Sequence, residues 1–199
     1  MDYQFSKILE ALRLLDGRLV LNQAGPFRLV VRGGAALNAT HLIQRTTNDV
    51  DVVALIGPKG ELADPAPLPE ELVNAAKEVT DTLALPEEWL NNGPSRGDGG
   101  LFRLGLPAEF KNRLVAGYQG EKLTVYFVGR LDQIHFKLYA AIDQFGGYHA
   151  SDLKQLLPTD EELLQAVAWA KTHDRSEGFK EAAKLFLREF GCERLVDKI

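Results

Sequence analysis

Two stretches decide the fold of the first half of this sequence: Val30-Val31-Arg32-Gly33-Gly34-Ala35-Ala36-Leu37 and the later triplet Asp49-Val50-Asp51. The apolar run Phe27–Val31 predicts a short strand, and Ala35–Ile43 is rich in helix formers. The two glycines between them predict a tight turn. The run Val50–Ile56 predicts a second, buried strand that carries both aspartates on one face at its start.

These two motifs suit phosphate and metal chemistry. Glycines between a strand and a helix let a phosphate approach backbone N–H groups closely. Two carboxylates on one face can bind divalent metals that bridge phosphate oxygens. Each motif alone has a simpler explanation, as an ordinary turn and as a solvated strand edge. Together the two motifs favour a binding site over these simpler explanations. Both acids lie at the start of the otherwise apolar strand VDVVALI, where an ionised side chain needs a cation or hydrogen bonds.

Helices and loops are predicted around this centre. Apolar residues from Phe5 to Leu15 recur at helical spacing, and Asp16-Gly17 is expected to end that helix. Pro58–Pro69 is rich in Gly and Pro and predicts a loop, whereas Glu70–Leu83 returns to helical periodicity. Leu85–Gly93 predicts a further short helix.

The next predicted elements are a polar loop at Pro94–Gly100 and a hairpin. The hairpin pairs Arg113–Tyr118 with the strand Lys122–Val128 across Gln119-Gly120. From Leu131 onward the sequence predicts only helices, near Leu131–Gln144, Ala150–Leu157, Thr159–Thr172 and Phe179–Phe190. Thr159 with Glu162 is a capping-box pattern. The expected fold is therefore α+β: a core at 1–130 with a small mixed sheet flanked by helices, and a helical C-terminal lobe at 131–199 packed on it.

Composition restricts the function classes. With 45% hydrophobic residues the chain can bury an ordinary core, and its single cysteine, Cys192, rules out a disulfide framework and a thiolate zinc cluster. No secretory or membrane-spanning apolar run is evident, so we expect a soluble, cytoplasmic protein. The net charge of −5 argues against a general nucleic-acid coat protein. The basic stretch Arg96–Lys137 remains open as a polyanion contact or as a solvated mixed surface.

The glycine turn followed by Arg45-Thr46-Thr47-Asn48-Asp49-Val50-Asp51-Val52 resembles the polymerase-β-like nucleotidyltransferase superfamily. More narrowly, it resembles the AbiEii or MenT-like branch, whose characterised members are often toxins of toxin–antitoxin systems. The similarity includes Glu88-Trp89-Leu90-Asn91, Arg130–Ala141 and His149–Leu153, and it spans roughly Arg28–Trp169.

This resemblance implies an enzyme that moves a nucleoside monophosphate from a nucleoside triphosphate (NTP) to an acceptor, with Mg²⁺ or Mn²⁺ as cofactor. A tRNA 3′ end or a protein hydroxyl is the implied acceptor, and a cognate antitoxin protein is an implied partner. By position, Gly33 and Gly34 would contact the triphosphate and Asp49 and Asp51 would bind the metal. Lys137 would neutralise the β- or γ-phosphate.

Further site residues are implied less directly. Arg45 and Thr47 would bind the nucleotide or hold the aspartates by hydrogen bonds. Asp152 matches a late aspartate of the branch, whereas His149 stands where another acid often falls. Trp89, Asn91 and Asn92 would either line the pocket or anchor and cap a short helix.

Many superfamily members take a third carboxylate, the general base, from a later strand, but Lys122–Val128 contains no acid. Either Asp152 or Asp132 replaces it, or the metal alone lowers the pKa of the attacking hydroxyl. The remaining hypotheses are a degenerate module that binds a nucleotide or a partner protein without turnover, and an adaptor built on the C-terminal helices.

Overall fold

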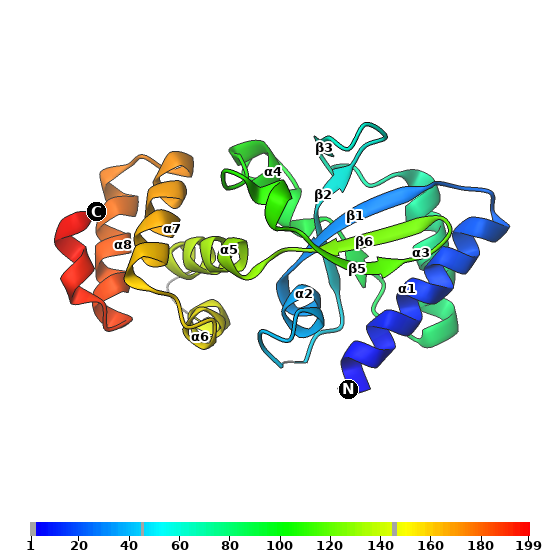
Figure 1. Cartoon of the computed structure of the whole chain (residues 1–199), viewed down its shortest axis with the longest axis horizontal. Coiled ribbons are helices and arrows are strands. Elements are labelled where there is room, and N and C mark those ends of the chain that lie inside the picture. Colours follow the sequence, from blue (N-terminus) through cyan, green and yellow to red (C-terminus); the bar gives the residue numbers. More distant parts are fainter. Residues whose placement is uncertain (1–2, 45, 145–146) are drawn as a thin grey trace. The chain divides into compact units, whose positions relative to one another are not determined.

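The computed structural model describes residues 3–44, 46–144 and 147–199 and confirms an α+β fold with a small mixed sheet flanked by helices (Figure 1). The chain divides into two compact units, Met1–Gly129 and Arg130–Ile199. The sheet belongs to the first unit, and the second unit is helical.

The sheet of the first unit has the strand order β3-β2-β1-β6-β5, and β4 also pairs with β2. Strand β1 runs antiparallel to β2 and parallel to β6, while β5 and β6 form the predicted hairpin. The strands are β1 (Phe27–Arg32), β2 (Val50–Ile56), β3 (Leu62–Ala63), β4 (Leu90–Asn91), β5 (Val115–Gln119) and β6 (Leu123–Phe127).

Two long helices cover one face of this sheet, and Figure 1 shows them beside the strands. Alternate residues of β1, β2 and β6 pack with leucines, alanines and a valine of α1 and α3 in one apolar cluster, because successive strand residues point to opposite faces. The helices of this unit are α1 (Tyr3–Leu21), α2 (Gly33–Ala39), α3 (Glu70–Leu83) and α4 (Leu101–Leu104), with 3₁₀ turns η1 (Gly93–Ser95) and η2 (Phe110–Arg113).

The predicted end of the first helix at Asp16-Gly17 is wrong, because α1 continues to Leu21. The Asp16 carboxylate does not cap the helix; it accepts hydrogen bonds from the backbone N–H groups of Glu121, Lys122 and Leu123, at 2.8–3.0 Å. Asp16 therefore fixes the β5–β6 turn.

Three further local predictions differ from the structure. Leu85–Gly93 is not a helix; it leads through a turn into β4, which pairs in parallel with the start of β2. The loop predicted at Pro58–Pro69 contains the short strand β3. The predicted helix Ala35–Ile43 begins earlier, at Gly33, and ends at Ala39.

The second unit contains the four predicted helices with shifted ends, followed by an unpredicted 3₁₀ segment. They are α5 (Arg130–Asp143), α6 (Gly147–Gln155), α7 (Asp160–His173), α8 (Glu177–Glu189) and η3 (Glu193–Lys198). The capping box at Thr159 and Glu162 is present as predicted.

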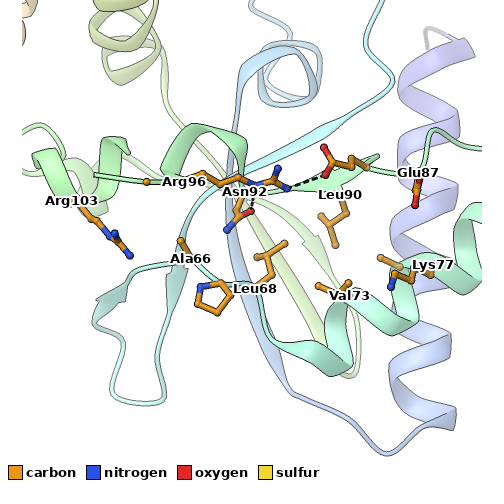
Figure 2. A pocket seen from close by; sticks show the side chains of 13 residues that line it. Ala66, Leu68, Val73, Lys77, Glu87, Leu90, Asn92, Arg96 and Arg103 are labelled. Carbon is orange, nitrogen blue, oxygen red and sulfur yellow. Dashed lines mark hydrogen bonds and ion pairs between the residues drawn. The ribbon is translucent and has the colours of Figure 1, made fainter. Parts of the chain in front are cut away.

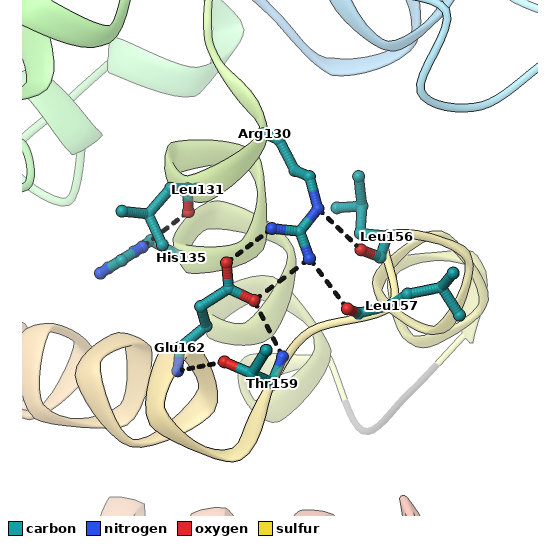
Figure 3. A network of polar contacts seen from close by, with 7 residues as sticks. All are labelled: Arg130, Leu131, His135, Leu156, Leu157, Thr159 and Glu162. Atoms are coloured by element: carbon teal, nitrogen blue, oxygen red, sulfur yellow. Dashed lines mark hydrogen bonds and ion pairs between the residues drawn. The ribbon is translucent and has the colours of Figure 1, made fainter.

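One arginine joins three of these helices (Figure 3). Arg130, at the start of α5, donates to the carbonyls of Leu156 and Leu157 just after α6, at 3.0 and 2.8 Å. Its guanidinium also forms a two-bond ion pair with Glu162 in the first turn of α7. Within the described residues, none of the helices is long and apolar enough to cross a membrane.

Candidate functional site

The predicted glycine turn is not a separate element, because β1 passes directly into α2. Arg32 ends β1, and Gly33, with φ of +73°, is already the first residue of α2. That left-handed backbone favours glycine, because a Cβ atom is strained there. Since α2 has only seven residues, its dipole is weak. The contribution of the glycines is therefore close packing.

The two glycines bring the two sequence motifs together. A Cβ atom on Gly33 would lie 2.9 Å from Oδ2 of Asp51, and one on Gly34 would lie 2.5 Å from Oγ1 of Thr47. Antiparallel pairing explains this proximity, because Arg32 at the end of β1 is opposite Asp51 near the start of β2. Both glycines are buried, and neither leaves room for a side chain.

Each aspartate is oriented by a hydrogen bond from a neighbouring side chain. The Thr47 hydroxyl donates to Oδ1 of Asp49 at 2.7 Å. Nδ2 of Asn91 donates to Oδ1 of Asp51 at 3.1 Å. Thr47 is buried, Asp51 is half-buried and Asp49 is exposed, so the two carboxylates differ in their access to water.

The aspartates line a cavity of about 470 Å³, a size usual for small-molecule sites. Its other lining residues are mostly polar and come from the segment before β2 and from the segment that leads into β4. The full lining is Thr46, Thr47, Asn48, Asp49, Asp51, Pro86, Glu88 and Asn91.

This donor set fits a magnesium ion that is shared with a substrate. Mg²⁺ is typically held by one or two carboxylates together with substrate phosphates, rather than by an all-protein cage. Among the described residues no group of three or more His, Cys, Asp and Glu side chains is arranged to hold a metal. Asp49 and Asp51 would supply the carboxylates of such a site, and both line the cavity.

The predicted residues Lys137 and Asp152 both belong to the second unit, where they pair with each other. Nζ of Lys137 lies 2.6 Å from Oδ2 of Asp152, and both side chains are buried. The lysine ammonium also lies 5.4 Å from the ring centre of Tyr148, within cation–π range. Asp132 lies on α5 and is fully buried. Arg45 lies outside the described residues.

The sequence interpretation missed the contact between Asn91 and Asp51. It considered Asn91 either as a pocket residue or as a helix cap, and only the pairing of β4 with β2 places it beside the aspartate. Glu88, which lines the same cavity, was also missed as a site residue. Both residues belong to a stretch that carries the resemblance, but a two-residue strand has no periodic signal that would have placed them beside Asp51.

A second cavity, of about 600 Å³, lies on the other side of β4 (Figure 2). Because strand residues alternate, Leu90 and Asn92 line this cavity while Asn91 lines the first. Nδ2 of Asn92 donates to the carbonyl of Pro65 at 2.8 Å, and Nε of Arg96 donates to Oδ1 of Asn92 at 2.9 Å. Arg96 also pairs with Glu88 at 3.3 Å, and this contact is drawn in Figure 2. Residues of the segment 88–96 therefore line both cavities.

No family model matches this chain, and neither the curated proteins nor the solved structures contain a match.

Proposed function

We propose that this protein is a Mg²⁺-dependent nucleotidyltransferase that moves a nucleoside monophosphate from an NTP to an acceptor hydroxyl. One observation carries the proposal: Gly33 and Gly34 pack directly against Asp51 and Thr47, at the cavity that also contains Asp49. The glycine pair and the two carboxylates, to which the resemblance assigns the phosphate and the metal, therefore lie side by side, and this proximity supports the proposal.

In the proposed reaction the acceptor hydroxyl releases its proton to water and its oxygen bonds to the α-phosphorus of the NTP. The bond from that phosphorus to the bridging oxygen breaks, and pyrophosphate leaves. Bound Mg²⁺ would neutralise the phosphate oxygens and favour the alkoxide form of the acceptor. Asp49 and Asp51 hold the metal in this scheme, and Thr47 keeps the Asp49 carboxylate in position. Gly33 and Gly34 pack against Asp51 and Thr47 in this scheme, and the resemblance assigns them the contact with the triphosphate.

The resemblance adds roles for residues outside this cluster. Lys137 is proposed to neutralise the β- or γ-phosphate, Arg45 to contact the nucleotide, and Asp152 to act with Lys137, with which it pairs. The proposed acceptor is a tRNA 3′ end or a protein hydroxyl. A role as the toxin of a toxin–antitoxin pair, with an antitoxin partner, is proposed from the same resemblance. A cytoplasmic location is proposed from the composition, which includes a single cysteine.

A transfer assay tests the proposal. Purified protein is incubated with each of the four α-³²P-labelled NTPs, Mg²⁺ and total tRNA, and label in RNA and in protein is measured after electrophoresis. We expect transfer by the wild type and a loss of at least about 10²-fold in the double variant Asp49→Ala, Asp51→Ala. The exposed acids Glu71 and Asp81 of α3 provide a matched double alanine control that keeps full activity.

Two results would contradict the proposal: no transfer from any NTP, or equal transfer by the wild type and the double aspartate variant. Labelled tRNA would identify an RNA acceptor, and labelled protein would identify a protein hydroxyl.

A second candidate function is a degenerate module that binds nucleotide without turnover. It is favoured by the absence of an acid from β6 and of a third acid grouped with the two aspartates among the described residues. Calorimetry separates the two functions. Nucleotide binding that needs Mg²⁺ and Asp49, without transfer, supports the binding module.

A further inference from the structure

Asn91 stands at a fixed position next to the candidate metal-binding carboxylate. Strand β4 is only two residues long, and its parallel pairing sets Asn91 opposite Asp51 in the sheet. Side chains at paired positions point to the same face, so the amide and the carboxylate meet above the sheet. The backbone N–H of Val50 also donates to the Trp89 carbonyl, which holds the two segments together.

The Asn91 amide makes three hydrogen bonds. Its Oδ1 accepts from the backbone N–H of Gly93 at 2.7 Å. Its Nδ2 donates to Oδ1 of Asp51 at 3.1 Å and to the backbone carbonyl of Glu88 at 3.3 Å. Both N–H bonds and one oxygen lone pair are therefore used.

These partners determine which way the amide faces. A backbone N–H can only donate, so the amide atom beside Gly93 must be the oxygen. The carboxylate of Asp51 and the carbonyl of Glu88 can only accept, so the atom beside them must be the nitrogen. A flipped amide would place oxygen against two oxygens and N–H against N–H. The orientation thus has one solution.

Gly93 takes part in this arrangement through its missing side chain. A Cβ atom there would lie 2.9 Å from Oδ1 of Asn91, closer than ordinary contact allows. Gly93 does not line the cavity, and its side-chain position is exposed. It therefore supports the amide from outside the site.

We propose that Asn91 is a positioning residue that fixes the Asp51 carboxylate for metal binding and is itself fixed by Gly93. The inference rests on the proposed function, in which Asp51 holds the metal. A carboxylate that can rotate loses entropy when it binds an ion, and a partner that fixes it beforehand removes part of that cost. Asn91 also neutralises part of the charge on Asp51 without adding a third negative side chain.

Mn²⁺ binding measures this role directly. Full-length protein is titrated with Mn²⁺ alone, and free Mn²⁺ is followed by electron paramagnetic resonance. Removal of a residue that orients a metal ligand typically costs about 10- to 100-fold in affinity, so we expect Asn91→Ala to weaken Mn²⁺ binding by that factor. Gly93→Ala should give a smaller loss, because it displaces the amide without removing it. Asp51→Asn is the reference for loss of the ligand itself.

Asn74→Ala is the matched control, because Asn74 is exposed on α3 and has no contact with the cavity. It should bind Mn²⁺ like the wild type. Thermal unfolding of each variant checks that a loss of affinity is not a loss of fold.

Each outcome is decisive. Wild-type affinity in Asn91→Ala, or an unchanged affinity in Gly93→Ala, overturns the positioning role, and so does a wild-type protein that binds no Mn²⁺. Weakened Mn²⁺ binding in both variants supports the role even if no NTP is ever transferred. In that case the positioning role stands and the proposed transferase activity fails.

Discussion

At the scale of single residues, Gly34 offers the sharpest test of close packing at the site. Its backbone is not left-handed, so alanine is not strained there, but the new Cβ would lie 2.5 Å from Oγ1 and 2.7 Å from Cβ of Thr47. Thr47 is branched and buried and cannot move aside freely. We expect Gly34→Ala to reduce the free energy of unfolding by about 1–3 kcal/mol in urea denaturation.

The same change should weaken Mn²⁺ binding, because a displaced Thr47 no longer holds Asp49. Gly99→Ala is the control, since a Cβ atom on Gly99 would meet nothing within 4 Å and its φ is ordinary. Equal stability of the Gly34 and Gly99 variants would show that the packing against Thr47 is looser than described.

The sequence indicated the glycines and the aspartates of the site, and it also indicated Thr47, whose predicted hydrogen bond to an aspartate is present. It did not indicate the hydrogen bond from Asn91 to Asp51. Gly33, Gly34, Asp49 and Asp51 form a local pattern of strand, turn and strand that periodicity and residue type reveal. Asn91 is forty residues from Asp51 in the sequence, and only the pairing of β4 with β2 brings it to the site. Contacts of that kind depend on the folded sheet, and a single sequence does not encode them in any local pattern.

At the scale of elements, the junction of α5, α6 and α7 predicts a pH dependence. The ion pair with Arg130 lowers the pKa of Glu162, opposed by partial burial and helped by the hydrogen bond from the backbone N–H of Thr159. A carboxyl group whose pKa is lowered by folding stabilises the protein above its unfolded pKa of about 4.3. This stabilisation is lost as the pH falls from the pKa of Glu162 in the unfolded protein to its lower pKa in the folded protein.

Glu162→Gln should therefore cost about 1–2 kcal/mol at pH 7, where glutamine keeps the cap but loses the charged pair. The variant and the wild type should approach each other in stability as the pH falls below about 4. Urea denaturation at several pH values, followed by Trp169 fluorescence in a Trp89→Phe background, measures the difference. Glu189→Gln, at an exposed site on α8, is the control. If the difference in free energy of unfolding between Glu162→Gln and the wild type stayed constant with pH, the ion pair would not be the source of this stability.

Long helices and strands were predicted more accurately than short ones. The long periodic segments, such as α3 and α7, were predicted closely, because many residues contribute to one pattern. The two-residue strands β3 and β4 were missed because tertiary pairing alone forms them. The helix α1 was ended too early because Asp16 resembles a helix stop, although its carboxylate serves the distant β5–β6 turn.

At the scale of the whole molecule, the two units carry one tryptophan each, and this makes their stabilities separately measurable. Trp89 is buried in the first unit and donates to the Ala76 carbonyl, whereas Trp169 lies on α7 in the second unit beside the rings of Phe136 and Tyr139. The sequence contains no other tryptophan. Trp89→Phe and Trp169→Phe backgrounds therefore each report on one unit.

Asp16→Ala is the change that should separate the units. It removes the acceptor of three backbone N–H groups at the β5–β6 turn, and we expect it to cost the first unit about 2–3 kcal/mol. In urea, the transition seen by Trp89 should move to lower concentration, while the transition seen by Trp169 should keep its midpoint. Asp81→Ala, at an exposed position on α3, should move neither. If Asp16→Ala moved both transitions together, the two units would unfold as one cooperative body, and a change at the candidate site could then act through the stability of the helical unit as well.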